Sequence, residues 1–590
     1  MCAINGFTWE DKEKISLMNS ATKSRGPDHS GVFIDGISLG HNRLSIIDLD
    51  NRSDQPSRSP DGRYTLIYNG ELYNFKDLKK SISYDFKTTS DTEVVLAAFL
   101  KWGRDCVKYF NGMYAFAIWD AKEKQLVLAR DPRGIKPLYY SVVGDTLIFS
   151  SEIRGILTHE VPRRLDQEAL GYFFSLLYVP EPYTLFNSIK KVPHGNVVTW
   201  KSGEIIFETF EPNRFAPTPE QSYAKRKGQI KGILGDAVQR QLVADVSVGV
   251  FLSGGVDSTA ILDRAVSAGF KPETFSTSFD LKGVSSDTKF NIDAELAEKT
   301  ASHYGVKHTT FCLSMKEIFE ALIPSMEALE EPNANPTFIP TYLLSKKVKD
   351  EVSVVLSGTG GDEFFGGYDR YKLSRRVSLA QSIFPPLRLL APQGVERYAK
   401  FMMQKKSELH GVPYTNASCL LKKRFFPKPT GRSMEEHLMR VDQETWLVDD
   451  TLLQSDKMSM AHGLEMRVPF LDEALVQYAH SLPLSDKVSV SNTKILLKEA
   501  FADNFPAHVL GQPKRGWFTP SAKWLREEAF TAFAKEVLSP SYYSETNTLF
   551  DWDMIQGALE SHISKQGYHR TLLWSVISFQ IWARANKVTL

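Results

Sequence analysis

VGVFLSGGVDSTAI, residues 248–261, is the stretch that decides the fold of the second half of this chain. Its apolar run is typical of a buried strand, SGG of a tight turn, and VDSTAI of the first turns of a helix. Glycines let backbone N–H groups approach a ligand closely, and a helix N-terminus adds partial positive charge, so this unit can hold a phosphate group. The alternative is a plain turn between a strand and a helix, and the Walker sequence GK[ST] does not follow.

A second stretch, VSVVLSGTGGDEFFGGY at residues 352–368, repeats the same order of elements. Apolar strands that are each followed by a glycine turn and a helix predict a parallel sheet. Asp257 and Asp362 follow the two turns, and Mg²⁺ ordinarily takes one or two carboxylates together with substrate phosphates. The alternative for Asp362 and Glu363 is that they are helix N-terminal acids that complement the dipole.

The first two hundred residues follow a different pattern. Short alternating or apolar runs, among them YTLIYNGELYNF, QLVLARD and TLIFSSE, are separated by turn residues such as PDG, DPRG and HGN. This pattern predicts a layered, antiparallel, β-rich domain with a few helices. The polar, proline-containing stretch FEPNRFAPTPEQS indicates the connection between two domains. We therefore expect a first domain at residues 2–205, a linker at 206–220 and a second domain at 221–590.

The composition is that of an ordinary soluble protein, with 590 residues, a net charge of +1 and no basic excess. We find no signal peptide and no apolar run of membrane-spanning length, so neither nucleic acid nor a membrane is an expected partner. Four scattered cysteines form no CxxC pair, which argues against a zinc site or a disulfide framework and favours a reducing cytoplasm; they are Cys2, Cys106, Cys312 and Cys419. Polar residues interrupt the C-terminal HRTLLWSVISFQIWARA, which we expect to be a core helix.

Several motifs resemble those of one family. SGGVDS resembles the signature of the ATP pyrophosphatases, and LLQSDKMSMAHGLEMRVPFLD, NTKILLKEAF and PKRGWFTP resemble the remaining blocks of the asparagine synthetase domain. In the first half, MCAINGF, SRGPDHSG, GHNRLSIID, YNGELYN, TSDTE, NGMYAFAIWD and LARDPRGIKPLYY resemble, in order, the N-terminal-nucleophile glutaminase domain of the glutamine-dependent asparagine synthetases. The resemblance implies a four-layer αββα Ntn-hydrolase sandwich, then a parallel-sheet α/β ATP-pyrophosphatase domain with extra helices. A homodimer is common in this family.

For the first half, the resemblance implies that Cys2 attacks glutamine. Once Met1 is removed, the α-amine of Cys2, with a reference pKa of about 8, can act as the base for its own thiol. Asn69 and Gly70 would bind the oxyanion, while Arg43 would form a bidentate ion pair with the α-carboxylate and Asp91 would bind the α-ammonium. The alternatives are a chance cysteine, a hairpin turn at Asn69-Gly70 and a surface arginine beside a strand. The implied glutamine-binding residues are Arg43, Leu44, Ser45, Ile46, Ile47, Asn69, Gly70, Glu71 and Asp91.

For the second half, the resemblance implies that ATP and Mg²⁺ convert an acceptor carboxylate into an acyl-adenylate, which ammonia from glutamine then displaces after passing through an internal tunnel. Lys494 would stabilise charge as the adenylate forms or reacts, and Lys498 either shares that role or is solvated. Ser278 stands where the family carries glycine, which weakens the transfer of a role to Thr277. The implied ATP-binding residues are Phe251, Leu252, Ser253, Gly254, Gly255, Asp257, Ser258, Thr277, Ser357 and Gly358, with Asp257 and Asp362 as metal ligands.

Thr359, in SGTGGDE, departs from the family at the acceptor-adenylate site. Asparagine-forming members carry glutamate there and related lactam-forming synthetases carry tyrosine, whereas threonine neither carries a proton at neutral pH nor brings negative charge. Three interpretations follow. The enzyme converts aspartate to asparagine, or it uses another carboxylate such as a uronic acid of a surface polysaccharide or a cell-wall amino acid, or it is a catalytically poor sensor of glutamine or nucleotide. The third is disfavoured because the other implied site residues are present.

Overall fold

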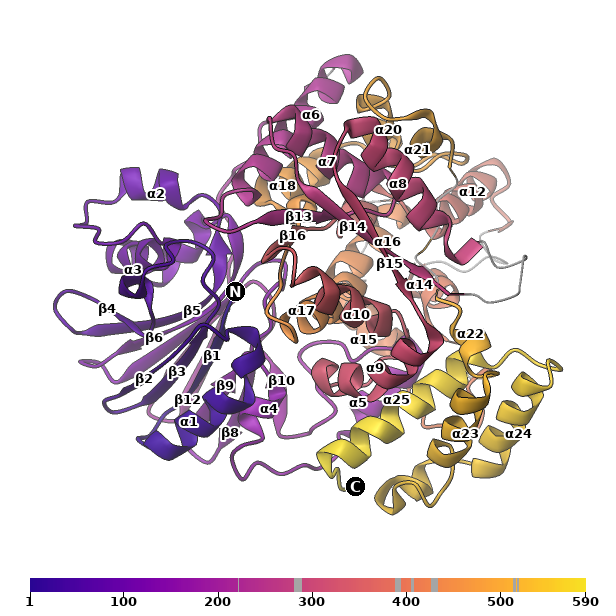
Figure 1. The fold of residues 1–590 in the computed structure, drawn as a ribbon, viewed down its shortest axis with the longest axis horizontal. Coiled ribbons are helices and arrows are strands. Elements are labelled where there is room, and N and C mark those ends of the chain that lie inside the picture. Colours follow the sequence, from indigo (N-terminus) through magenta and orange to yellow (C-terminus); the bar gives the residue numbers. More distant parts are fainter. Residues whose placement is uncertain are drawn as a thin grey trace.

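The computed structural model describes residues 1–220, 222–280, 289–387, 394–404, 408–425, 433–512, 516 and 519–590. Figure 1 shows two bodies side by side, a β-sandwich formed by the first part of the chain and a mainly helical body built around a second kind of sheet. The predicted division into a β-rich half and a helix-rich half is therefore confirmed.

Two six-stranded antiparallel sheets form the sandwich. In spatial order, the first contains β10 (Ile189–Lys191), β8 (Tyr139–Val143), β9 (Thr146–Ser150), β1 (Ala3–Phe7), β3 (Ser38–Arg43) and β2 (His29–Ile34). The second contains β12 (Glu204–Thr209), β11 (Asn196–Lys201), β7 (Gln125–Arg130), β6 (Gly112–Asp120), β5 (Tyr64–Leu72) and β4 (Ser57–Arg58). The expected boundary after residue 205 falls inside β12. This edge strand is largely exposed, so it lacks the alternating apolar pattern that would have revealed it.

Alternation along the strands builds the layers of the sandwich. In β6, Ala117 and Trp119 belong to the core between the sheets, whereas Phe116 and Ile118 belong to the cluster on the outer side, as the two-residue period of a strand requires. Helices cover both outer faces, α1 (Lys12–Ala21) and α4 (Ile153–Ile156) on the first sheet, α2 (Phe75–Ser81) and α3 (Asp91–Trp102) on the second. The four-layer arrangement expected from the sequence is confirmed.

The second body contains a five-stranded parallel sheet, in the order β15 (His308–Leu313), β14 (Glu273–Phe279), β13 (Val248–Phe251), β16 (Val354–Leu356) and β17 (Glu465–Arg467). From β13 the chain builds outward through β14 and β15, and then returns to place β16 on the other side of β13. This reversal leaves a crevice at the carboxyl ends of β13 and β16, the usual ligand position in such sheets. Both predicted glycine turns therefore meet at this edge.

Helices cover both faces of this sheet, which explains the continuous apolar runs in its strands. Val354 and Leu356 of β16 pack on one side and Val355 packs on the other. The helices of this half are α6 (Tyr223–Gln241), α7 (Val256–Ser267), α8 (Ile292–Tyr304), α9 (Met315–Leu329), α10 (Phe338–Val348), α11 (Gly361–Phe365), α12 (Asp369–Ile383), α14 (Gly394–Met402), α15 (Ser418–Phe425), α16 (Met434–Glu444), α17 (Leu453–Met460), α18 (Glu473–Ser481), α19 (Leu484–Lys487), α20 (Ile495–Ala500), α21 (Ala507–Gly511), α22 (Ser521–Trp524), α23 (Glu528–Val537), α24 (Trp552–Ile563) and α25 (Arg570–Asn586).

The C-terminal helix α25 is a core helix, as expected, with residues 572–583 buried. It shares one hydrophobic cluster with α5 (Gln167–Leu176) of the first half, so the two bodies are packed together and not merely tethered. Within the described ranges, every helix is too short or too polar to cross a membrane. Most of the PKRGWFTP motif, at positions 513–515 and 517–518, lies outside the described residues, as do positions 426–432 of RFFPKPTGRSMEEHLMR, a helix-like and basic stretch that the sequence predicts to pack around the synthetase site.

Candidate active sites

Cys2 lies at the start of β1, where β5 of the opposite sheet brings Asn69 next to it. The backbone N–H of Cys2 donates to Asn69 Oδ1 at 2.9 Å. The other side-chain atom of Asn69, Nδ2, is buried and has no hydrogen-bond partner among the described residues. A buried donor left unpaired costs about 1–3 kcal/mol, and this one lies beside a thiol that would generate an oxyanion. The arrangement fits the predicted role of Asn69.

Asn69 and Gly70 lie in the middle of β5, opposite Ala115 and Tyr114 of β6. The alternative that Asn-Gly marks a hairpin turn is therefore wrong. A Cβ at position 70 would lie only 2.3 Å from the carbonyl oxygen of Met113, so glycine is needed here because β6 passes close to β5.

The Cys2 side chain is buried, and the burial raises the pKa of its thiol, although the N-terminal ammonium, the backbone N–H of Leu44 and the charge of Arg43 act in the opposite direction. The thiol is therefore neutral at physiological pH and needs a base before it can attack. With Met1 in place, the chain's ammonium lies one residue upstream and pairs with Glu465 Oε2 of β17 at 2.7 Å. Removing Met1 would move the free amine to Cys2 itself.

Arg43, at the end of β3, is buried, so the alternative of a surface arginine is wrong. Its Nη1 donates to Asp54 Oδ1 at 2.7 Å and to the carbonyl oxygen of Asp50 at 2.9 Å, and its Nη2 contacts the carbonyl oxygen of Asp48. A glutamine carboxylate bound by Arg43 would have to compete with Asp54 for the guanidinium.

Asp91 and Glu71 are also buried beside β5. Asp91 Oδ2 accepts hydrogen bonds from Tyr68 Oη and the backbone N–H of Leu72, both at 2.9 Å. Glu71 Oε2 pairs with Arg467 of β17 at 3.1 Å. Burial raises the pKa of both acids, and their charges repel each other. A substrate ammonium placed between them would relieve that cost.

The segment 44–47, which the resemblance assigns to glutamine binding, connects the nucleophile to the second half. The backbone N–H of Leu44 donates to the carbonyl oxygen of Met1 at 3.1 Å, and the carbonyl of Ile46 accepts from the backbone N–H of Asp245 at 2.9 Å. Ser45 donates its backbone N–H to Asp28 Oδ2 at 2.7 Å, while Ile47 packs against the hydrophobic cluster beside the parallel sheet of the second body.

At the parallel sheet, the two glycine loops are in direct contact. Ser253 Oγ and Ser258 Oγ lie 3.1 Å apart across the first loop. In the second loop, a Cβ at Gly358 would lie 2.9 Å from Asp257 Cβ, and one at Gly361 would lie 2.6 Å from Asp257 Cγ. Glycine is thus required at both positions, because the start of α7 occupies the space that a side chain would need.

Lys494 joins the two predicted carboxylates. Its Nζ pairs with Asp362 Oδ1 at 2.5 Å and with Asp257 Oδ2. Burial alone would lower the pKa of Lys494, but the two carboxylates outweigh this effect and raise it. Lys494 holds a left-handed backbone conformation with φ of 52° at the start of α20, a strained geometry typical of functional positions. A Cβ at Gly367 would lie 2.3 Å from Lys494 Cε, so glycine makes room for the ammonium.

These groups lie in one cavity of about 700 Å³, within the range of small-molecule sites. All ten residues that the sequence assigned to ATP line it, together with Thr359, Asp362, Lys494 and Lys498. Thr359 Oγ1 lies 2.9 Å from Ser357 Oγ, so its hydroxyl is held by the loop. No group of three or more His, Cys, Asp or Glu in the described ranges could hold a metal ion. Two carboxylates are nevertheless sufficient for Mg²⁺ when phosphates complete its coordination.

Sequence reasoning missed the far wall of this cavity. It is formed by the loop before α10, by α10 itself and by a π-helix at Trp446–Leu452 that continues into α17; its residues include Asn335, Thr337, Thr341, Trp446, Asp450 and Gln454. The adjacent aspartates 449 and 450 were the available signal, because two acids in succession within an otherwise buried helix are expensive.

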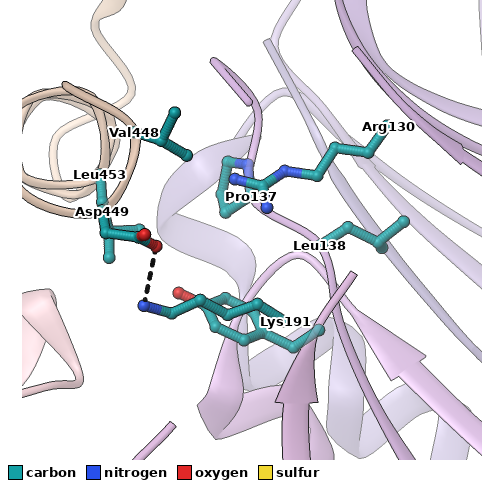
Figure 2. Close-up of a pocket in the computed structure, with 8 residues that line it drawn as sticks. Arg130, Pro137, Leu138, Lys191, Val448, Asp449 and Leu453 are labelled. Atoms are coloured by element: carbon teal, nitrogen blue, oxygen red, sulfur yellow. Dashed lines mark hydrogen bonds and ion pairs between the residues drawn. The ribbon is translucent and has the colours of Figure 1, made fainter. Parts of the chain in front are cut away.

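The SRGPD, PRGIKP and SDKMSMA motifs hold the two bodies together. Arg25 pairs with Asp456 of α17 at 2.6 Å, and Lys136 pairs with the same carboxylate at 3.1 Å. Figure 2 shows Lys191 of the sandwich reaching toward Asp449, at 3.2 Å. Beside this pair is a cavity of about 10 Å³, about the space that one water molecule needs. It is lined from both bodies, by Arg130, Pro137, Leu138, Tyr139, Lys191, Val448, Asp449 and Leu453.

Comparisons with known proteins find matches to both halves of the chain. The family model described as "Glutamine amidotransferase domain" matches residues 1–211, and the model described as "Asparagine synthase" matches residues 229–584. Asparagine synthetase [glutamine-hydrolyzing] 1 of Bacillus subtilis is 33% identical, over 98% of this chain and 94% of the relative. A putative asparagine synthetase [glutamine-hydrolyzing] of Mycobacterium tuberculosis is 32% identical, over 96% and 93%. Amidase chry2 of Gibberella zeae is 25% identical, over 95% and 93%.

Proposed function

Because the chain belongs to the glutamine-hydrolysing asparagine synthetase family, we propose that it is an ATP-driven amidotransferase that moves the amide nitrogen of glutamine onto an acceptor carboxylate. The observation that carries the proposal is the convergence of Asp257, Asp362 and Lys494 at the mouths of two glycine loops in one cavity. Both halves of the reaction then have a site in the same chain.

In the sandwich, Cys2 attacks the glutamine amide with its own α-amine as base, after Met1 has been removed. Asn69 Nδ2 and the backbone N–H of Gly70 stabilise the oxyanion, and Asp91 and Arg43 hold the α-ammonium and the α-carboxylate. Ammonia leaves, and water hydrolyses the γ-glutamyl thioester. Asn69 supports this assignment because its unpaired donor lies beside Cys2.

In the second body, the glycine loops and the N-terminus of α7 bind the phosphates of ATP. The acceptor carboxylate oxygen attacks the α-phosphorus, pyrophosphate leaves, and ammonia then displaces AMP from the acyl-adenylate. Lys494 neutralises charge during these steps. Asp257 and Asp362 would hold Mg²⁺, which when bound neutralises the charge of the departing pyrophosphate.

Aspartate is the first acceptor to test, because the asparagine synthetase relatives carry that name. Thr359 favours a second candidate, the same chemistry on another carboxylate such as a uronic acid or a cell-wall amino acid, because it removes the family acid from the cavity. A cytoplasmic location and a homodimer are family expectations; light scattering after size-exclusion chromatography measures the latter.

The deciding experiment is pyrophosphate release by purified protein with ATP, Mg²⁺ and glutamine, comparing L-aspartate with a panel of carboxylates. Release with aspartate, together with asparagine formation, establishes the first candidate. Release with a sugar acid or another amino acid alone establishes the second. If glutamine is hydrolysed but no acceptor triggers release, the synthetase proposal fails and the sensor interpretation replaces it.

The Cys2→Ala variant is the matched control. It should lose glutamine-dependent amide formation while keeping synthesis from ammonium chloride, because Cys2 precedes β1 of the sandwich whereas the glycine loops belong to the second body. Loss of both activities would contradict the assignment of Cys2 to the glutaminase step alone.

A further inference from the structure

One helical segment forms the boundary between the two bodies. In the π-helix and the start of α17, Val448, Asp449 and Leu453 line the small interface cavity, whereas Asp450 and Gln454 line the large synthetase cavity. Consecutive aspartates thus line different cavities, because successive side chains of any helix point in different directions around its axis. Such single π-turns are frequent at functional sites.

Asp449 and Asp450 differ in their surroundings. Asp449 is neutralised by Lys191 and accepts a hydrogen bond from the backbone N–H of Glu181 at 3.0 Å. Asp450 is 3% exposed, and no cation in the described parts of the chain lies within ion-pair distance of it. Its recorded hydrogen bond comes from Asn333 Nδ2 to Oδ1 at 2.6 Å. This hydrogen bond engages Oδ1, and the residue lines the synthetase cavity.

Asn333 fixes the orientation of this carboxyl group. Its Oδ1 accepts from the backbone N–H of Asn335 at 2.7 Å, so its Nδ2 must be the atom that faces Asp450. Its own backbone N–H donates to Ser578 Oγ of α25 at 2.8 Å. The donor is therefore held from two directions, and Asp450 is positioned by a rigid support.

Burial and the neighbouring charge of Asp449 raise the pKa of Asp450 to about 7, with the Asn333 hydrogen bond acting in the opposite direction. A carboxylate with a pKa near the working pH is suited to accept a proton during a reaction. Several other acids of the cavity have partners: Asp257 and Asp362 bind Lys494, and Asp369 pairs with Lys372 at 2.7 Å. Glu363, whose pKa burial also raises to about 7, accepts a hydrogen bond from Tyr368 Oη at 2.6 Å. Thr359 can supply no such base.

We propose that Asp450 is the catalytic base of the amide-forming step, in the place of the acid that Thr359 lacks. The inference rests on the proposed function. Ammonia nitrogen forms a bond to the acyl-adenylate carbonyl carbon, which gives a tetrahedral intermediate bearing an ammonium group. Asp450 takes one proton from that nitrogen, the bond between carbon and the AMP oxygen breaks, and AMP leaves with the electron pair. Asp450 then passes the proton to water.

The test compares the Asp450→Asn variant with the wild-type protein, using ATP, Mg²⁺ and L-aspartate, or the carboxylate that supports pyrophosphate release. ATP–pyrophosphate exchange reports adenylation, which needs no amine, and should change less than threefold. Amide formation from ammonium chloride should fall by about 10²–10⁴-fold, the usual contribution of a positioned base. Hydroxylamine is a less basic nucleophile whose adduct loses its proton readily, so hydroxamate formation should fall less than tenfold.

Three outcomes would overturn the proposal. If Asp450→Asn lowers exchange and amide formation equally, Asp450 acts in acceptor binding or in folding. If amide formation is unchanged, Asp450 takes no part in the reaction. If hydroxamate formation falls as far as amide formation, Asp450 does not act by proton transfer. Asp450→Glu keeps a carboxylate and should recover at least tenfold of the lost amide formation. Asp503→Asn removes an exposed acid outside the cavity and should match the wild type in all assays. Wild-type protein without exchange would count against the proposed function instead.

Discussion

Replacing Asn69 with leucine should separate catalysis from stability. The substitution removes Nδ2, a buried donor that has no partner in the described structure, and so removes a cost of about 1–3 kcal/mol. It also removes Oδ1, which leaves the N–H of Cys2 without its acceptor at a cost of similar size. The two effects oppose each other, and leucine keeps the branched shape of asparagine at Cγ. The free energy of unfolding should therefore change by only about 1 kcal/mol.

Glutamine hydrolysis should respond very differently. Loss of one oxyanion donor lowers kcat by about 10²–10³-fold, or about 2.7–4 kcal/mol. The assay is glutamate release from glutamine, alongside urea unfolding and pyrophosphate release with ammonium chloride, which should stay at the wild-type rate. A fall in kcat below tenfold with intact folding would refute the oxyanion role.

Asn5 offers a matched control, since it is also a buried asparagine on a strand but has its hydrogen bonds made. Its Nδ2 donates to Asn19 and Thr22, and its Oδ1 accepts from Ser150. Asn5→Leu should destabilise the fold by several kcal/mol, because it leaves these partners unpaired, with kcat of the folded fraction within about threefold of the wild type. Equal effects at Asn5 and Asn69 would show that Asn69 acts only through folding.

Three further predictions concern the second body and the interface. Lys494→Met should reduce acceptor-dependent ATP–pyrophosphate exchange by at least about 100-fold and spare glutaminase activity, and retained exchange would contradict its charge-neutralising role. Gly361→Ala should impair the same exchange, because a Cβ would lie 2.6 Å from Asp257 Cγ; ATP binding by calorimetry checks this, and unchanged affinity would show that the loop yields freely. Burial would raise the pKa of Glu330, but the charges of Lys457 and Arg154 outweigh burial and lower this pKa to about 2. The ionised Glu330 therefore stabilises the fold fully above about pH 4.5, and this stabilisation is lost as the pH falls toward 2. Glu330→Gln should lower the free energy of unfolding by about 3–5 kcal/mol at pH 7 and flatten the fall in thermal stability between pH 5 and pH 3, and an unchanged slope would count against this assignment.

Local sequence predicted the elements around both sites because glycine turns and alternating apolar residues act over a few positions. The SGG and SGTGG loops meet as expected, since adjacent parallel strands end at one edge of the sheet. The Asn69-Gly70 pair shows the limit of such reasoning. Its composition is typical of a turn, but the close approach of β6 explains the glycine, and that approach depends on residues more than forty positions away.

The positions that sequence could not predict are set by long-range packing. Asp450 lies on the cavity wall because the helix is packed between the two bodies, with Asp449 beside Lys191 and Asp450 on the cavity side, and hydrophobic periodicity carries no sign of that packing. The end of the sandwich at Thr209 was missed because β12 is an exposed edge. The contacts of Arg43 with Asp54 and nearby carbonyls could not be predicted either, because only the folded loop brings these acceptors to it.

The buried ion pairs between α17 and the sandwich mean that the two bodies cannot easily exist as separate polypeptides. Arg25, Lys136 and Asp456 are almost completely buried. Separating the bodies would break these ion pairs and leave partly buried charges without a partner, which is energetically costly. A protease cut in the connecting stretch 210–222 should therefore yield two fragments that co-elute as one particle. Over evolutionary time, the same pairs would tie changes on one side to compensating changes on the other, so that domain shuffling between distant relatives would yield insoluble hybrids.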